Sequence, residues 1–143
     1  MNLRESWVLF AFGSAFFAGL TALFGKIGVA GINSNLATLI RTVVILLVTA
    51  GILWLRNEWR PTAPISTTTW LFLVLSGIAT GLSWLCYYRA LQLGPVTRVA
   101  PIDKLSVVFA ILLGVLFVGE TLTWPVIVGG GLIVAGSIVM IAF

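Results

Sequence analysis

The chain has 143 residues, of which 60% are hydrophobic and only 8% are charged, and its formal net charge is +4. Its mean hydropathy is +1.17. Because charged residues make up about a quarter of an average soluble domain, this composition excludes a water-soluble globular domain. It indicates that lipid covers most of the outer surface.

Five apolar segments are long enough to cross a bilayer. A hydrocarbon core of about 30 Å requires about 20 apolar residues in a helix. The runs are continuous and lack the alternation of a transmembrane β-barrel wall, so we expect an all-α integral membrane protein with five transmembrane helices. In chain order, the predicted helices cover residues 7–26, 36–55, 70–91, 99–118 and 124–143.

The connecting segments are rich in turn residues, and polar residues stand before two of the helices. Gly94-Pro95 separates the third helix from the fourth. Ser66–Thr69 offer N-caps for the third helix, and Thr123 offers one for the fifth. We therefore expect residues 1–143 to form one transmembrane domain with little mass outside the bilayer.

The charged residues divide unevenly between the two membrane faces. Five spans place the termini on opposite faces, and the face holding the N-terminus carries three bases and three acids. The other face carries five bases and one acid, which accounts for the whole net charge of +4: Lys26, Arg41, Arg89, Arg98, Asp103 and Lys104. This asymmetry predicts a cationic vestibule that attracts an anionic or zwitterionic solute.

Arg41 and the Asp103-Lys104 pair lie inside apolar segments. Ionisable residues at such depth usually face a bundle interior or a water-filled cavity, and this is what we expect of Arg41. Four other bases are equally compatible with snorkelling from helix ends to the headgroups: Lys26, Arg89, Arg98 and Lys104. Asp103 either forms a structural ion pair with Arg41, Arg89 or Lys104, or handles a ligand or proton directly.

Aromatic residues accompany these charges in the third helix. Trp84 and Tyr88 combine an apolar body with a polar tip, so they either line a solute path or serve as packing and interface residues. The full set of candidates for a substrate cavity is Lys26, Arg41, Trp84, Tyr88, Arg89, Asp103 and Lys104.

Other residues are expected to be structural. Glu120 precedes the fifth helix, where a carboxylate complements the positive helix end, so we predict a capping role. Small residues four apart let helices approach closely, within the chain or between chains. The pairs of this type are Gly77 and Gly81, Ala110 and Gly114, and Gly131 and Ala135.

The residue inventory makes several other activities improbable. The chain has no histidine and one cysteine, Cys86, so we expect neither a metal site nor a cofactor. It also lacks a nucleophile with a paired base, which argues against an enzyme. No basic run occurs, which argues against nucleic-acid binding.

The orientation in the membrane is not determined by charge. When Arg41 and Lys104 are assigned to a cavity, each face keeps three bases, and the positive-inside rule makes no choice. Such a balance is compatible with insertion in both directions and with an antiparallel dimer.

Several motifs resemble the EamA-domain family of the drug/metabolite transporter superfamily. They are Lys26-Ile27-Gly28, Ala37–Thr42, Tyr88–Val96 continuing through Val99–Ile102 to Phe117–Thr123, and the glycine-rich segment Gly129–Gly136. The resemblance covers essentially the whole chain. It implies a five-helix transport domain that in longer relatives occurs twice, as an inverted repeat around a central solute cavity.

A single copy of this domain implies either a homodimer, possibly antiparallel, or a homologous partner chain. The resulting hypothesis is a secondary, alternating-access transporter of a small polar metabolite or drug-like solute in the cell (inner or plasma) membrane. Two alternatives stay open: a non-transporting membrane subunit or scaffold, and a subunit of a lipid-carrier flippase.

Overall fold

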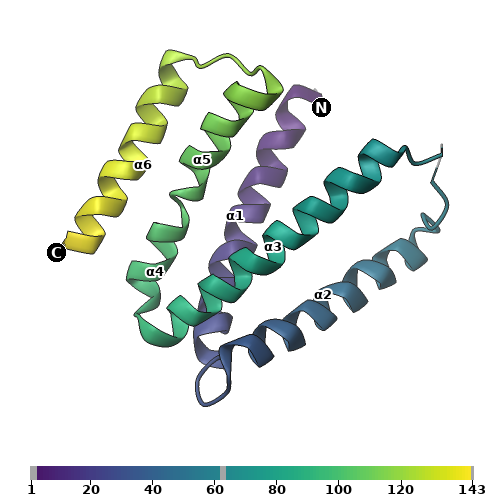
Figure 1. Cartoon of the computed structure of the whole chain (residues 1–143), viewed down its shortest axis with the longest axis horizontal. Coiled ribbons are helices and arrows are strands. Elements are labelled where there is room, and N and C mark those ends of the chain that lie inside the picture. Colours follow the sequence, from purple (N-terminus) through teal and green to yellow (C-terminus); the bar gives the residue numbers. More distant parts are fainter. Residues whose placement is uncertain (1–2, 62–63, 143) are drawn as a thin grey trace. The chain divides into compact units, whose positions relative to one another are not determined.

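The structure is a computed structural model that describes residues 3–61 and 64–142. Within these residues all regular secondary structure is helical and no strand is present, which confirms the predicted all-α fold. The elements are α1 (Leu3–Gly28), α2 (Ser34–Leu55), α3 (Thr67–Leu93), α4 (Val96–Asp103), α5 (Ser106–Leu113), the π-helix η1 (Gly114–Val118) and α6 (Trp124–Ala142) (Figure 1).

Five segments are long and apolar enough to cross a membrane, as predicted. They are Trp7–Gly28, Ser34–Leu55, Thr67–Leu93, Val96–Val118 and Trp124–Ala142. Their ends differ from the predicted ends by at most three residues; the predicted last residue, Phe143, lies outside the described residues. Large apolar side chains on these helices are exposed because lipid, not protein, is their natural environment.

Polar side chains fix where two helices begin. Ser66 Oγ accepts a hydrogen bond from the Thr69 backbone N–H at 3.1 Å, which confirms the predicted cap of α3. Asn33 Oδ1 accepts from the Asn35 N–H at 2.8 Å at the start of α2. These bonds satisfy amides that a first helical turn leaves unpaired. Both helices therefore begin before the apolar run.

The fourth span is not the continuous helix that the apolar run suggests. It divides into α4, α5 and η1, with the first break at Lys104 and Leu105. Pro101 has no N–H to donate to the preceding turn, and its carbonyl accepts from both the Lys104 N–H and Ser137 Oγ, each at 3.1 Å. The Leu105 N–H then bonds to Ile102 O at 3.0 Å, one residue closer than in an α-helix. The helix tightens and breaks there.

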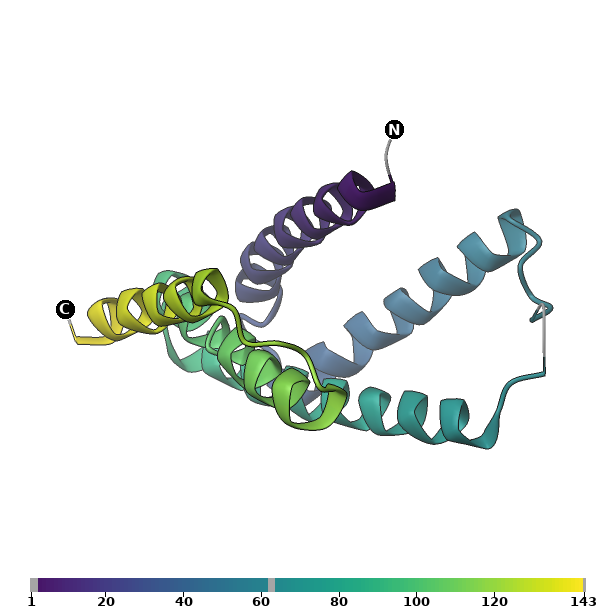
Figure 2. The same cartoon turned by 90° about the horizontal axis from the view of Figure 1, so that it is seen from above.

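The described chain separates into two compact units. Phe24–Gln92 forms one unit, with the end of α1, α2 and nearly all of α3, and the residues on either side of this segment form the other. In the second unit α6 lies alongside α4 and α5 (Figures 1 and 2). Ser137, which is buried, and Gly130, which lies beside Ile111 Cδ1, belong to the packed side of α6.

We expect Ser137→Ala to weaken the contact between α6 and α4, because Pro101 O loses its hydrogen bond from α6. Hydrogen bonds between membrane helices contribute about 0.6 kcal/mol on average and about 1.7 kcal/mol at most, so the free energy of unfolding should fall within that range. Unfolding in a detergent titration measures it. Ser14→Ala, at an exposed α1 hydroxyl without a hydrogen bond in the described chain, is the control. Equal stability of the two variants would contradict the prediction.

Candidate functional site

Arg41 stacks on an aromatic ring of the neighbouring helix. The residue lies two turns into α2, and its guanidinium carbon is 3.1 Å from the ring centroid of Trp84 and 5.7 Å from that of Tyr88. Trp84 and Tyr88 are four residues apart on α3 and therefore share one face of that helix. A cation over an indole face is stabilised by about 0.5–2 kcal/mol, more when water is excluded.

The aromatic residues also contact one another. The Trp84 ring meets Tyr87 edge to face, with centroids 5.5 Å apart, and its centroid is 5.8 Å from that of Tyr88. Tyr88 is buried and lies against Gly25 of α1, where a Cβ would be only 3.2 Å from the tyrosine hydroxyl. Tyr88 thus packs, while Trp84 is half-buried and presents its ring to Arg41.

The Arg41 guanidinium keeps its hydrogen-bonding capacity. Among the described residues of its own unit, 24–61 and 64–92, its N–H groups donate to no carbonyl, hydroxyl or carboxylate, and no acid forms an ion pair with it. It borders a groove of about 370 Å³ between α2 and α3. The lining residues are Arg41, Thr42, Ile45, Leu73, Ser76, Gly77, Thr80, Gly81 and Trp84.

Gly77 and Gly81 form part of this groove. We predicted that this pair mediates helix packing, but no atom lies within 4 Å of a Cβ built on either residue. Among the described residues of this unit, no other helix therefore approaches the pair closely. Packing against another chain stays a prediction.

Two other cationic candidates bond to helix ends and do not line the groove. Lys26 Nζ donates to Leu91 O at 2.6 Å, in the last turn of α3, where a cation complements the helix dipole. Arg89 Nη1 donates to Gln92 Oε1 at 2.7 Å, and Gln92 Nε2 donates to Ile32 O at 2.8 Å. These bonds tie the end of α3 to the α1–α2 connection.

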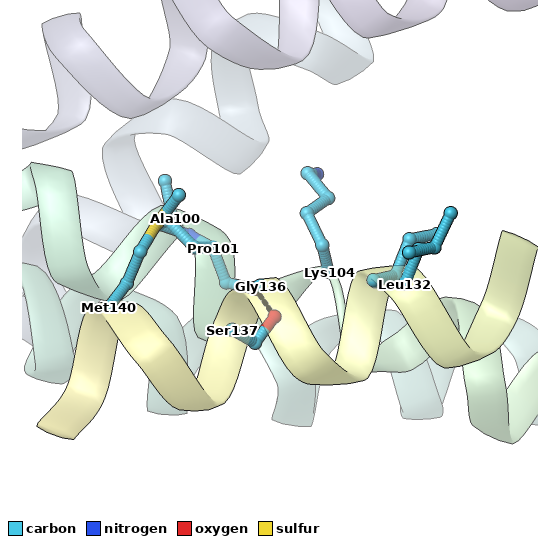
Figure 3. A pocket seen from close by; sticks show the side chains of 8 residues that line it. Ala100, Pro101, Lys104, Leu132, Gly136, Ser137 and Met140 are labelled. Atoms are coloured by element: carbon cyan, nitrogen blue, oxygen red, sulfur yellow. Dashed lines mark hydrogen bonds between the residues drawn. The ribbon is translucent and has the colours of Figure 1, made fainter.

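Asp103 and Lys104 belong to the other unit and lie at the break of the fourth span. Their carboxylate and ammonium are 3.4 Å apart, so one of the three ion pairs we considered for Asp103, that with Lys104, is formed within this unit. Lys104 borders a hollow of about 420 Å³ (Figure 3). The hollow is larger than the Arg41 groove, but its other lining residues are uncharged: Ala100, Pro101, Leu132, Ile133, Gly136, Ser137 and Met140.

The remaining residues assigned to capping and packing lie in the same unit as Asp103 and Lys104. The Glu120 carboxylate lies over Gly114, and its Oε2 is 2.9 Å from the position that a Cβ would occupy on that glycine. The capping of α6 by Glu120 stays a prediction. Gly119 has a φ of +76° and turns the chain after η1. Ala110, Gly131 and Ala135 are exposed, and their packing role, within the chain or between chains, stays a prediction.

The sequence profile of the EamA-like transporter family matches residues 5–142, almost the entire chain. The chain belongs to this family. A protein of Sinorhizobium sp. described as an uncharacterized transporter in the cobO 3′ region is 52% identical over 141 residues, which cover 99% of this chain and 100% of that protein. No solved structure matches the chain.

The EamA-like chain also contains groove residues that sequence reasoning missed. Thr42, Ser76 and Thr80 line the groove, and Gly25 makes room for Tyr88. The available signal was spacing: Ser76, Thr80 and Trp84 recur every four residues on α3, which places them on the face that carries Tyr88.

We expect Gly25→Ala to destabilise the protein by about 1–3 kcal/mol, the usual cost of overpacking a close contact. The added Cβ would lie 3.2 Å from the Tyr88 hydroxyl and 3.3 Å from Leu91 Cδ1, and both residues are buried. Gly28→Ala is the matched control, since nothing lies within 4 Å of its Cβ position. Thermal unfolding in detergent compares the variants, and a Gly25→Ala protein as stable as the control would refute the expectation.

Proposed function

We propose that this protein is a secondary transporter of a small polar solute and that Arg41 binds an anionic group of that solute. The observation that carries the proposal is a guanidinium inside a membrane span, stacked on Trp84 and bordering a groove, with its N–H groups uncommitted among the described residues of its own unit. Arg41 lies about 10 Å along the helix axis from Ser34 at the start of α2.

The energetic setting supports a solute role for Arg41. A charged side chain within a membrane span is costly and usually faces a cavity or a partner. Here the partner is a ring face, which stabilises the cation but accepts no conventional hydrogen bond. A carboxylate accepts two parallel N–H bonds from a guanidinium, and such charge-assisted pairs are about twice as strong as neutral hydrogen bonds.

Transport by one five-helix domain needs a second domain to complete a cavity. We assign this role to a second copy of the chain, inserted in the same or the opposite direction, or to a homologous partner chain, in the cell (inner or plasma) membrane. Two such units would rock about the site and expose it to each side in turn. The sequence has no GxxxxGK[ST] loop for ATP, so exchange or an ion gradient is the proposed driving force.

Arg41→Ala tests this function. With the protein in proteoliposomes, we expect solute uptake and ligand affinity to fall at least tenfold, because the site loses its anion-binding group, while assembly by size-exclusion chromatography is retained. Arg41→Lys should give an intermediate loss, since an ammonium keeps the charge but not the planar, bidentate geometry. Ligands for the assay come from a thermal-shift screen of purified protein against small carboxylates and zwitterions.

Arg60→Ala is the control for a lost positive charge, because Arg60 lies outside the groove and the membrane spans. It should leave uptake unchanged. Full uptake by Arg41→Ala would exclude the proposed role of Arg41. Loss of assembly in Arg41→Ala, with no ligand bound by the wild type, would favour a scaffold over a transporter.

A further inference from the structure

We infer that the solute is an amphipathic monocarboxylate: one carboxylate held by Arg41, joined to a flat, uncharged body that lies along α3. This inference rests on the proposed function and narrows its solute class. Anionic and zwitterionic solutes both fit a single cation, so the choice between them depends on the rest of the groove.

The charge of the ligand follows from the residues around Arg41. Arg41 is the only charged residue among those lining the groove in the described chain. Among these residues a second carboxylate would therefore find no cation, and an ammonium would find no anion while lying close to the Arg41 charge. Because an unpaired ion in an apolar site is strongly disfavoured, the groove selects a ligand with one negative charge.

The three hydroxyl groups of the groove, those of Thr42, Ser76 and Thr80, are neutral, so none of them compensates the charge of a second carboxylate. Those of Thr42 and Thr80 are also already engaged as donors. Thr42 Oγ1 donates to Thr38 O at 2.8 Å, and Thr80 Oγ1 donates to Ser76 O at 2.8 Å. Their hydrogens are committed to the backbone, so they can only accept hydrogen bonds from a ligand. Neutral acceptors suit a hydroxyl or amide N–H on the ligand body, but they do not supply a second anion-binding point.

The shape of the body follows from the floor of the groove. Gly77 and Gly81 have no atom within 4 Å of their Cβ positions, and Leu73 and Ile45 continue the lining as apolar side chains. From Trp84 to Leu73 the floor extends eleven residues, or about 16 Å of helix. At Gly77 and Gly81 the floor carries no side chain, and this open space within a groove of about 370 Å³ leaves room for a flat ring.

Four small molecules with one skeleton test the charge requirement. Phenylpropionate carries one carboxylate, phenylalanine adds an ammonium, phenylsuccinate adds a second carboxylate, and phenylpropanamide has no charge. We expect purified protein in nanodiscs to bind phenylpropionate at least tenfold more tightly than the other three, as measured by thermal shift and competition. Oleate is included because a carboxylate can also arrive from the bilayer.

Gly81→Leu tests whether the ligand body lies over the groove floor on α3. It should weaken phenylpropionate binding at least tenfold by occupying that space. Gly51→Leu is the matched control: Gly51 lies on α2, also has nothing within 4 Å of its Cβ position, and does not line the groove. It should bind phenylpropionate as the wild type does.

The outcomes separate the two proposals. Arg41-dependent binding of phenylalanine or phenylsuccinate as tight as that of phenylpropionate would overturn the monocarboxylate inference and leave the proposed function intact. The inference of a flat ligand body would be overturned by Arg41-dependent binding of oleate alone, or by undiminished phenylpropionate binding in Gly81→Leu. If no acid bound in an Arg41-dependent way, the proposed function itself would fall.

Discussion

The stacking of the Arg41 guanidinium on Trp84 is the interaction on which the groove depends. A cation in an apolar helix is costly in a bilayer, and an aromatic face offsets part of this cost without neutralising the charge. An acid at the same place would pair with the guanidinium and occupy its donors. With Trp84 as partner, the indole ring stabilises the charge by contacting the flat face of the guanidinium. The N–H groups at the edge of the guanidinium stay available to a solute.

Trp84 can hold the cation only if the end of α3 is itself held in place. Tyr88, one turn further along, fits against Gly25, and the Lys26 ammonium bonds to Leu91 O at 2.6 Å. Two consecutive residues of α1 therefore fix the last turns of α3: Gly25 leaves room for Tyr88, and the Lys26 ammonium binds a backbone carbonyl. This geometry favours a positioning role for Lys26 over direct contact with solute.

The five spans were predictable because each is a long apolar run, and the depth of Arg41 in such a run singled it out. Other features depended on tertiary contacts. Two residues four apart, such as Gly77 and Gly81, fit close helix packing and an open groove floor equally well. Asp103 had three possible partners in the sequence, and the pair with Lys104 became visible only in the structure. At the break, Pro101 O accepts a hydrogen bond from Ser137, which is 36 residues away in sequence.

The fourth span and the Arg41 groove show two ways of placing polar groups at membrane depth. At the break, Pro101 O accepts from Ser137, and Lys104 pairs with Asp103, so the polar groups are satisfied by protein. Irregular backbone at this depth is tolerated on that condition. Arg41 instead keeps its donors open beside an otherwise uncharged groove. A group whose hydrogen bonds are left to be completed from outside the chain is the better candidate for solute recognition, even though the hollow beside Lys104 is larger.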